Sequence, residues 1–318
     1  MTRAVDATRA SRPVPGLTAI ALAAAVWGTT GTATHFAPGV PASVFGAVTF
    51  GLGGLVLAAA AGRGSVRAVT AQGTRRWAWL GAVSLAVYAV AFYAALADAG
   101  VALGTTVAIG TSPVFAGLVE WAAERRRPTL RWGLATLVSV VGMVVVTLAR
   151  SEGGVGSGSL PVGLACALLA GLTYALYSWA IARGMGAPAR ALPGGPGAEI
   201  VERAGPGKRG LVGAVFGLAA VPLVVLAAVV GHDALGVPGN WPVFLYLALV
   251  PTVLGHSLYA LGLRTVSASG ATLLSLLEPV VAAVLAVLVV GEHLGAAGWA
   301  GIVLVVLGLA LLALPARR

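Results

Sequence analysis

One acidic residue, Glu278, and a proline, Pro279, stand side by side in the middle of a long apolar run at residues 267–290. A carboxylate near the centre of a bilayer costs about 2.5–3.5 kcal/mol on insertion scales, so intramembrane acids usually face a cavity and serve function. Pro279 cannot donate a backbone hydrogen bond, which frees the carbonyl of Ser275 one turn earlier. Irregular backbone at this depth is tolerated only against protein or a water-filled cavity. An acid and a helix break at one mid-membrane point therefore indicate a transport pathway.

The composition agrees with a membrane location. The chain has 318 residues, of which 58% are hydrophobic and only 9% are charged, and its mean hydropathy is +0.96. Soluble domains carry about 25% charged residues, so these values indicate an all-α integral membrane protein. The net charge of +10 does not indicate nucleic-acid binding, because the basic residues lie in short segments between apolar runs. Cys166 is the only cysteine, which excludes an internal disulfide and cysteine-based metal sites. We expect no metal and no cofactor.

Ten apolar runs are each long enough, at about 20 residues, to cross a bilayer as a helix. They lie near residues 17–35, 41–61, 77–97, 101–122, 130–149, 160–182, 211–231, 241–262, 267–290 and 295–314. If the N-terminus is cytoplasmic, every basic residue except Arg150 falls in a cytoplasmic segment, as the positive-inside rule requires. The first run has the basic start of a signal peptide, but Trp27-Gly28-Thr29-Thr30 is polar for such a segment, so we retain it as a span. Both termini are therefore expected in the cytoplasm.

The two halves of the chain repeat the same order of motifs. Trp27-Gly28 in the first run parallels Tyr174-Ala175 in the sixth, and Ser112-Pro113-Val114 in the fourth parallels Glu278-Pro279-Val280 in the ninth. Five spans per copy require the copies to insert with opposite orientations, and inverted repeats supply two near-equivalent conformations around a midplane site. The expected segments are a cytoplasmic tail at 1–16, a first five-helix repeat at 17–149, an outer loop at 150–159, a second five-helix repeat at 160–314 that includes a Gly/Pro-rich cytoplasmic linker at 184–210, and a tail at 315–318.

Aromatic residues with polar groups gather in the runs that would surround such a site. All six tyrosines fall in the third, sixth and eighth runs. The second, fifth, seventh and tenth runs have no tyrosine, histidine or ionisable group away from their ends. These four are expected to be lipid-facing or packing helices, whose glycines permit close approach. The residues expected to line a substrate cavity are Glu278, Trp27, Tyr174, Tyr93, His256, Tyr259, Tyr88 and Tyr177. Pro113 and Pro279 are expected to break their helices at corresponding depths.

The candidates also have structural interpretations. Glu278 could bind a proton or cation, or it could be a hydrogen-bonded acid that holds the break at Pro279. Trp27 and Tyr174 could form an aromatic floor for the substrate or pack as ordinary core residues. A lone histidine such as His256 is more often a structural hydrogen-bonding residue than a ligand.

Residues nearer the span ends could have different roles. Tyr93 and Tyr259 could gate a pathway rather than bind its substrate. Glu120, one turn before Glu124, is expected to extend toward the basic segment Arg125–Arg127, with its apolar stem against the helix.

Three motifs carry a family resemblance. They are Leu273-Leu274-Ser275-Leu276-Leu277-Glu278-Pro279-Val280 through Gly291-Glu292-His293-Leu294, Thr111-Ser112-Pro113-Val114 through Glu124-Arg125, and Val26-Trp27-Gly28-Thr29. In these the chain resembles the drug/metabolite transporter superfamily, in its ten-helix EamA-type branch, over about residues 17–314. The resemblance implies export or exchange of small metabolites, often amino acids or related compounds, with spans 1, 3, 4, 6, 8 and 9 around a central cavity.

Together these features predict a secondary transporter of the cytoplasmic membrane that moves a small neutral or zwitterionic metabolite by alternating access. Proton coupling is one of the roles open to Glu278. Phosphorylated substrates would lack a partner, because no cation stands at the midplane. A channel-like pore and an intramembrane enzyme are the alternatives. A channel would use rings of charge or carbonyls, whereas Glu278 is alone. The chain lacks the His-Glu-x-x-His, Gly-x-Gly-Asp and Gly-x-Ser-x-Gly motifs, so we do not expect an enzyme.

Overall fold

The structure is a computed structural model that describes residues 16–125, 127–150, 158–186, 210–291 and 293–313. Within these ranges the secondary structure is helical, without strands. The elements are α1 (Gly16–Gly28), α2 (Thr30–Thr34), α3 (Ala42–Ala61), α4 (Arg63–Thr70), α5 (Arg75–Ala99), α6 (Val101–Glu124), α7 (Leu130–Arg150), α8 (Leu160–Gly184), α9 (Leu211–Val230), α10 (His232–Leu235), η3 (Pro238–Asn240), α11 (Trp241–Leu247), η4 (Ala248–Gly255), α12 (His256–Gly262), α13 (Ala268–Leu274), α14 (Leu277–Leu285), η5 (Ala286–Val290) and α15 (Ala296–Ala313).

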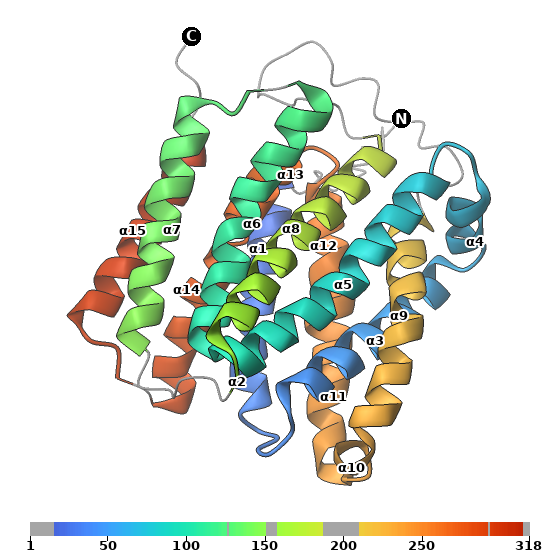
Figure 1. Cartoon of the computed structure of the whole chain (residues 1–318), viewed down its shortest axis with the longest axis horizontal. Coiled ribbons are helices and arrows are strands. Elements are labelled where there is room, and N and C mark those ends of the chain that lie inside the picture. Colours follow the sequence, from blue (N-terminus) through green and yellow to red (C-terminus); the bar gives the residue numbers. More distant parts are fainter. Residues whose placement is uncertain (1–15, 126, 151–157, 187–209, 292, 314–318) are drawn as a thin grey trace, which may run out of the picture.

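The apolar runs of the sequence become the long helices of a bundle (Figure 1). In the described part of the chain, nine helical segments are long and apolar enough to cross a membrane, from Gly16–Thr34 to Ala268–Val290. These nine correspond in order to the first nine predicted spans. The run predicted at 295–314 forms a shorter apolar helix, Ala296–Leu312. Helices predominate because a single segment that crosses lipid can satisfy its backbone N–H and C=O groups only through hydrogen bonds within a helix.

Contacts between distant segments show that the start of α1 and the end of α15 lie at the same end of the bundle. A carbon added at Gly16, where α1 begins, would lie 3.1 Å from the carbonyl oxygen of Gly262, where α12 ends. Trp132, near the start of α7, donates its indole N–H to the carbonyl of Ser269 (3.3 Å), near the start of α13. The side chain of Arg131 donates to the carbonyl of Leu311 (2.7 Å), in the last turn of α15. The start of α1 and the end of α15 therefore share one end of the molecule.

Each helix in one half of the chain has a counterpart in the other half. When the helices of a packed pair are replaced by their counterparts, the result is again a packed pair. α1 packs against α12 and α14, and its counterpart α8 packs against α5 and α6. Likewise, α5 packs against α9, and their counterparts η4 and α3 pack against each other. The remaining major pairs, α3 with α9 and α7 with α15, join each helix to its own counterpart. The contacts thus have the pattern of an internal twofold relation.

Glycine lets the peripheral pairs approach backbone to backbone, as the sequence predicted. A carbon added at Gly142 of α7 would lie 2.7 Å from the carbonyl oxygen of Gly301 of α15, and one added at Gly301 would lie 2.7 Å from that of Gly142. On α3, a carbon added at Gly54 would lie 2.6 Å from the carbonyl oxygen of Phe216 on α9. These contacts need residues without a side chain, because interhelical attraction in lipid depends on close packing.

A short helix not expected from the sequence, α4, follows α3 without a long loop. Gly62 makes this possible, because its φ of 50° ends α3 in a conformation that side chains rarely adopt. The Ser65 hydroxyl donates back to the Ala58 carbonyl of α3 (3.2 Å), and the Thr74 hydroxyl donates to the Ala68 carbonyl of α4 (2.9 Å). Both ends of α4 are thereby tied to the bundle.

Candidate functional site

The helix that contains Glu278 is interrupted just before its proline. α13 ends at Leu274 and α14 begins at Leu277. Pro279 cannot donate to the Ser275 carbonyl, and this carbonyl instead accepts the backbone N–H of Glu278 at 2.9 Å. The Ser275 hydroxyl donates to the Thr272 carbonyl at 2.7 Å. The interruption is therefore a tight turn whose polar groups have partners, as buried backbone requires.

The corresponding proline does not interrupt its helix, and the predicted break at Pro113 is wrong. α6 runs from Val101 to Glu124 with Pro113 inside it. The carbonyl that Pro113 leaves without a partner belongs to Ile109, and the Ser112 hydroxyl donates to it at 2.8 Å. Serine can reach this carbonyl, which is one reason why proline is tolerated inside membrane helices.

The acid lies between the first and third membrane segments. Glu278 is half-buried, and its carboxylate interacts electrostatically with the hydroxyl groups of Tyr88 and Tyr93 on α5. α1 approaches it closely, because a carbon added at Gly28 would lie 2.9 Å from the Glu278 carbonyl oxygen. The Tyr93 ring occupies the space above Gly46 of α3, where an added carbon would lie only 1.6 Å from the ring.

Trp27 is the centre of a buried group of rings. Its centroid lies 4.8 Å from that of His256 and 5.1 Å from that of Tyr259, both on α12. Its indole N–H donates to the carbonyl of Pro251 at 2.9 Å. Pro251 lies in η4, where the hydrogen-bond spacing is that of a π-helix, a local form that is frequent at functional sites.

The tyrosines extend this group of rings toward the acid. Tyr259 stacks with Tyr174 at 6.1 Å between centroids, and Tyr174 lies 5.3 Å from Tyr88. Phe92 then bridges Tyr88 and Tyr93, at 5.6 and 5.4 Å. A continuous series of ring contacts thus joins Trp27 to Tyr93. Aromatic pairs at such spacings each contribute about 0.5–1.5 kcal/mol beyond the area they bury.

Tyr177 and His256 occupy the most enclosed part of the ring group. The Nδ1 atom of His256 lies 3.1 Å from the Thr252 carbonyl, and its ring lies 6.2 Å from that of Tyr177. Tyr177 is fully buried, and its hydroxyl has no hydrogen-bond partner within the described part of the chain. By contrast, the Tyr259 hydroxyl pairs with that of Ser178 at 2.9 Å.

The eight predicted site residues therefore come together. Seven belong to one series of ring contacts, and the eighth, Glu278, interacts with two of its tyrosines. Ser257, which neighbours His256 in sequence, is exposed and donates to its own helix at the Val253 carbonyl. Among the described residues, no three His, Cys, Asp or Glu side chains lie close enough to hold a metal ion. The site is thus an isolated carboxylate beside aromatic rings and phenol hydroxyls.

The sequence is similar to those of known proteins over nearly its whole length. The EamA-like transporter family matches residues 14–148 and 201–314. The chain belongs to the EamA-like transporter family. The first matched segment includes Trp27 and the second includes Glu278, while Tyr174 and Tyr177 lie between the two.

Two further proteins extend the comparison for this EamA-like chain. An uncharacterized transporter of Bacillus subtilis (strain 168), YwfM, is 31% identical over 304 residues, which cover 94% of each protein. A solved structure described only as "Crystal structure of protein" has a TM-score of 0.75 at 22% identity, and the match covers 95% of this chain and 98% of that one. The solved structure supports the fold alone. With the family match and the apolar helices, these findings identify a multi-pass membrane transporter.

Sequence reasoning missed three residues of the site of this EamA-like transporter. Pro251 carries the carbonyl that holds Trp27, and a proline in the middle of an apolar run was an available signal. Phe50 of α3 and Phe216 of α9 pack against the His256 ring at 5.7 and 4.7 Å. They come from helices whose interiors carry no polar aromatic residue, so no sequence feature distinguished them from phenylalanines that face lipid.

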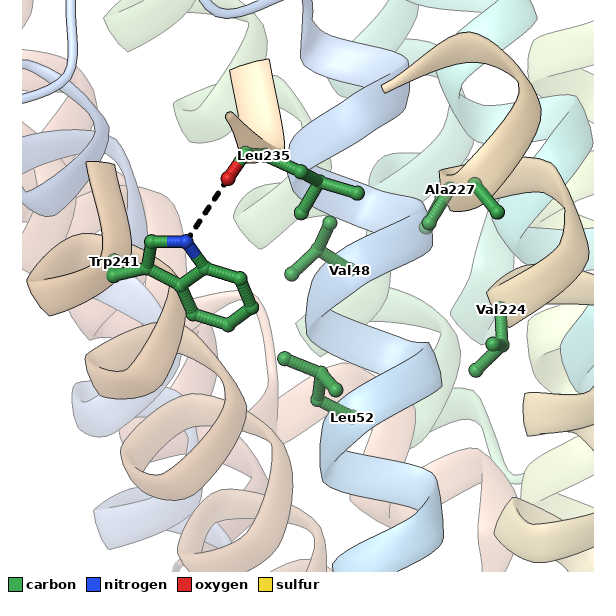
Figure 2. Close-up of a pocket in the computed structure, with 8 residues that line it drawn as sticks. Val48, Leu52, Val224, Ala227, Leu235 and Trp241 are labelled. Atoms are coloured by element: carbon green, nitrogen blue, oxygen red, sulfur yellow. Dashed lines mark hydrogen bonds between the residues drawn. The ribbon is translucent and has the colours of Figure 1, made fainter. Parts of the chain in front are cut away.

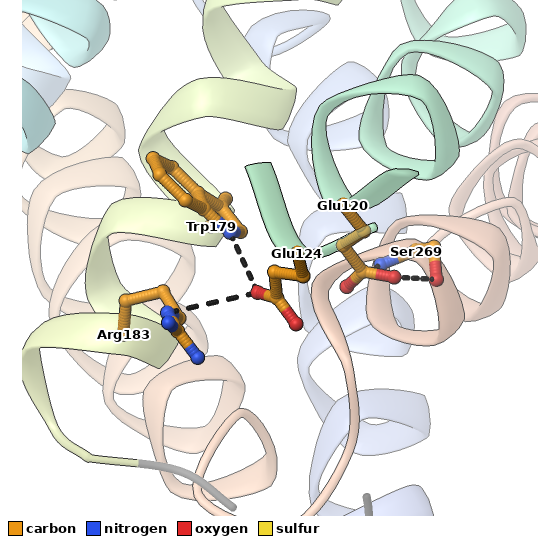
Figure 3. Close-up of polar contacts among 5 residues, drawn as sticks. All are labelled: Glu120, Glu124, Trp179, Arg183 and Ser269. Atoms are coloured by element: carbon orange, nitrogen blue, oxygen red, sulfur yellow. Dashed lines mark hydrogen bonds and ion pairs between the residues drawn. The ribbon is translucent and has the colours of Figure 1, made fainter. Parts of the chain in front are cut away.

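A second group of polar contacts joins the end of α6 to the second half of the chain (Figure 3). The Glu120 carboxylate accepts the backbone N–H of Ser269 at 3.0 Å and its hydroxyl at 2.5 Å. Glu124 accepts the indole N–H of Trp179 at 2.9 Å and lies 3.6 Å from Nε of Arg183. The expectation that Glu120 extends toward Arg125–Arg127 is therefore wrong, because its carboxylate binds the first turn of α13.

An apolar pocket of about 160 Å³ lies apart from these polar residues (Figure 2). Val48 and Leu52 of α3, Val224 and Ala227 of α9, and Trp241 of α11 contribute to its lining. The indole N–H of Trp241 already donates to the Leu235 carbonyl at 3.0 Å. The pocket offers no group to bind a polar solute, so it is not the candidate site.

Proposed function

We propose that this protein is a secondary transporter that moves a small amine-bearing metabolite, such as an amino acid or a related compound, across the cytoplasmic membrane. Alternating access around Glu278 is the mechanism, and export or exchange is the physiological result. Ten spans form two five-helix repeats of opposite orientation, with both termini in the cytoplasm.

The observation that carries the proposal is that helices in one half of the chain make the same contacts as their counterparts in the other half, and that these contacts surround one acid. α1 packs on α12 and α14 as α8 packs on α5 and α6. Two halves with matching contacts can adopt two arrangements of nearly equal energy, each open to one side, and inverted repeats in transporters work in this way. The tight turn before Pro279 places irregular backbone at this centre, where it can act as a hinge.

Charge at the two ends supports the orientation. Arg63, Arg75 and Arg183 lie at the end of the bundle where α6 ends, and so do Arg125 and Arg264. Asp98 and Asp233 lie at the opposite end. The basic end is cytoplasmic by the positive-inside rule. We place the protein in the cytoplasmic membrane on this basis.

The chemistry of the centre supports an amine-bearing substrate. Glu278 can pair with an ammonium group, and the rings of Tyr88 and Tyr93 can accept the same group through their faces. Trp27, Tyr174 and Tyr259 form the aromatic floor on which an apolar part of the substrate rests. Among the described residues, arginines occur only at helix ends and in the connecting segments, so a phosphate group would lack a partner at this depth.

Counterflow in proteoliposomes tests the function directly. Vesicles loaded with unlabelled amino acids or small amines should take up the labelled compound by saturable exchange, and Glu278→Gln should strongly reduce this exchange while the variant stays folded. Asp233→Asn provides a matched loss of one carboxylate at an exposed position outside the spans and should exchange normally. Unitary currents at channel rates, or full exchange by Glu278→Gln, would contradict the proposal.

A further inference from the structure

The cytoplasmic end of α6 is tied to the second half of the chain by two carboxylates. Glu120 accepts two hydrogen bonds from Ser269, and so it caps α13 from a different helix. The side chain of Ser267 accepts the backbone N–H of Gly270 at 3.2 Å, so the first turn of α13 has two separate acceptors. Hydrogen bonds to a charged acceptor are about twice as strong as neutral ones. We call this contact and the one made by Glu124 the inner latch.

Glu124 makes the second part of the inner latch. Its carboxylate joins α6 to α8 through the indole of Trp179 at 2.9 Å and the guanidinium of Arg183 at 3.6 Å (Figure 3). The Glu124 side chain is only 11% exposed, whereas that of Arg183 is 38% exposed. The inner latch therefore holds three segments, α6, α8 and α13, and each contact crosses from one half of the chain to the other.

The matching positions at the opposite end cannot form this latch. Counted from the two prolines, Glu120 corresponds to Ala286 and Ser269 corresponds to Leu103. Counted from Trp27 and Tyr174, the partners of Glu124 correspond to Thr32 and Phe36. Leu103 and Phe36 are exposed apolar residues, at 40% and 64%. Glu292, the sequence counterpart of Glu124, lies outside the described residues, but neither Thr32 nor Phe36 offers the charged partner that Arg183 provides.

Burial varies in the same direction as the inner latch. Between the latch and the centre, the side chains of Tyr177, Ser178 and Tyr259 are fully buried. Glu278 and Tyr93, at the centre and toward the opposite end, are only half-buried. The bundle is thus packed shut on the latched side of the acid.

We propose that Glu120 and Glu124 are positioning residues that hold the cytoplasmic side closed at rest, so that the substrate site faces outward until the inner latch opens. This inference rests on the orientation and the alternating access given under Proposed function. The two halves would otherwise favour both arrangements nearly equally. The inner latch has no equivalent of the same kind at the other end, and contacts that form in only one of two arrangements shift the population toward that arrangement.

Cysteine accessibility can measure this shift. In a Cys166→Ala background, the substitution Thr272→Cys places an inner reporter at a fully buried position, one turn inside the latch on α13. Thr105→Cys, in a separate variant, places an outer reporter at a half-buried position in the outer part of α6. Each reporter is labelled with a membrane-impermeant maleimide in inverted vesicles and in right-side-out vesicles, and folding is checked by size-exclusion chromatography.

The double variant Glu120→Ala/Glu124→Ala should accelerate labelling of the inner reporter from the cytoplasmic side by about tenfold or more, given the strength of hydrogen bonds to charged groups. It should also slow labelling of the outer reporter from the outer side. Glu120→Gln keeps an oxygen that can accept from Ser269, so it should give a smaller increase and remains testable if the double variant does not fold. Asp98→Ala removes a contact at the opposite end, where the carboxylate accepts the Ser159 N–H at 3.3 Å, and should leave labelling of the inner reporter unchanged.

Unchanged labelling of the inner reporter in the latch variants would overturn the inference, and so would an equal increase with Asp98→Ala, because that increase would reflect general loosening. Labelling of the inner reporter from the outer side would instead overturn the proposed orientation. Failure of the proposed function has a separate sign, which is the absence of counterflow by the unmodified protein.

Discussion

Replacing Trp27 with phenylalanine should destabilise the protein through a single lost hydrogen bond. The indole N–H donates to the Pro251 carbonyl at 2.9 Å, and both residues are buried. Phenylalanine keeps an aromatic ring beside His256 and Tyr259 but removes the indole donor to this carbonyl.

The expected loss is about 1–2 kcal/mol. A buried group left without its hydrogen-bond partner costs about 1–3 kcal/mol, and measured interhelical hydrogen bonds in membrane proteins average about 0.6 kcal/mol with a maximum near 1.7. The Pro251 carbonyl belongs to the π-helical segment η4, so η4 should also become less ordered. Counterflow should fall as well, because η4 leads directly into the helix that carries His256 and Tyr259.

Trp241→Phe is the matched control, because it removes the same type of bond in a different environment. The Trp241 indole donates to the Leu235 carbonyl at 3.0 Å, but the side chain is 37% exposed. Water or lipid headgroups can replace the lost donor there, so the cost should stay below about 0.5 kcal/mol. The measurement is the midpoint of reversible unfolding in mixed micelles as the denaturing detergent is increased. Equal costs for the two variants would refute the reasoning from burial.

Three other perturbations follow from the same structure. Gly142→Ala should weaken the pairing of α7 with α15, because the added carbon meets backbone atoms at 2.6–2.7 Å. Gly133→Ala on the same helix meets nothing within 4 Å and should be neutral or stabilising. The unfolding midpoints of the two variants would show the difference. Tyr177→Phe should leave stability unchanged or raise it, since it removes a buried hydroxyl without a partner among the described residues, and a loss above about 1 kcal/mol would show that the hydroxyl is satisfied. If Glu278 couples transport to protons, any exchange that survives in Glu278→Gln should no longer vary with pH, and an unaltered pH profile would exclude that coupling.

The positions of the spans could be predicted because lipid leaves the backbone few choices. Nine of the predicted runs became apolar helices of spanning length in the described part of the chain. The run length alone suffices, since any other backbone conformation would expose polar groups to hydrocarbon. α4 was missed because it is short and carries Arg63 and Arg67, so its composition resembles that of a connecting loop.

The two prolines show why local motifs did not decide the helix breaks. Both stand in corresponding places, but serine precedes Pro113 and glutamate precedes Pro279. The Ser112 hydroxyl reaches the carbonyl that its proline leaves free, and α6 continues. At Pro279 the Ser275 carbonyl is satisfied by the Glu278 backbone N–H instead, which tightens the turn and divides the helix. The preceding side chain, rather than the proline, separates the two outcomes.

The candidate site could be predicted only where the residues carried polar groups. Tyrosine, histidine and glutamate are costly in lipid, so their positions indicated the interior of the bundle. Phenylalanine is equally stable against lipid or protein, and Phe50 and Phe216 gave no such indication. The partner of Glu120 could not be predicted either, since Ser269 lies far away in sequence and meets it only through the packing of α6 against α13.

The unequal lengths of the helices have a consequence for the surrounding lipid. α15 has 18 residues and α5 has 25, so they are about 27 and 37 Å long at 1.5 Å per residue. The hydrocarbon core is about 30 Å thick. α5 is long enough to lean, as its slanted course in Figure 1 illustrates, whereas α15 is about 3 Å shorter than the core even when it stands upright. We expect the acyl chains to shorten beside the described part of α15, so that the bilayer is thinner on that flank of the protein than on the other.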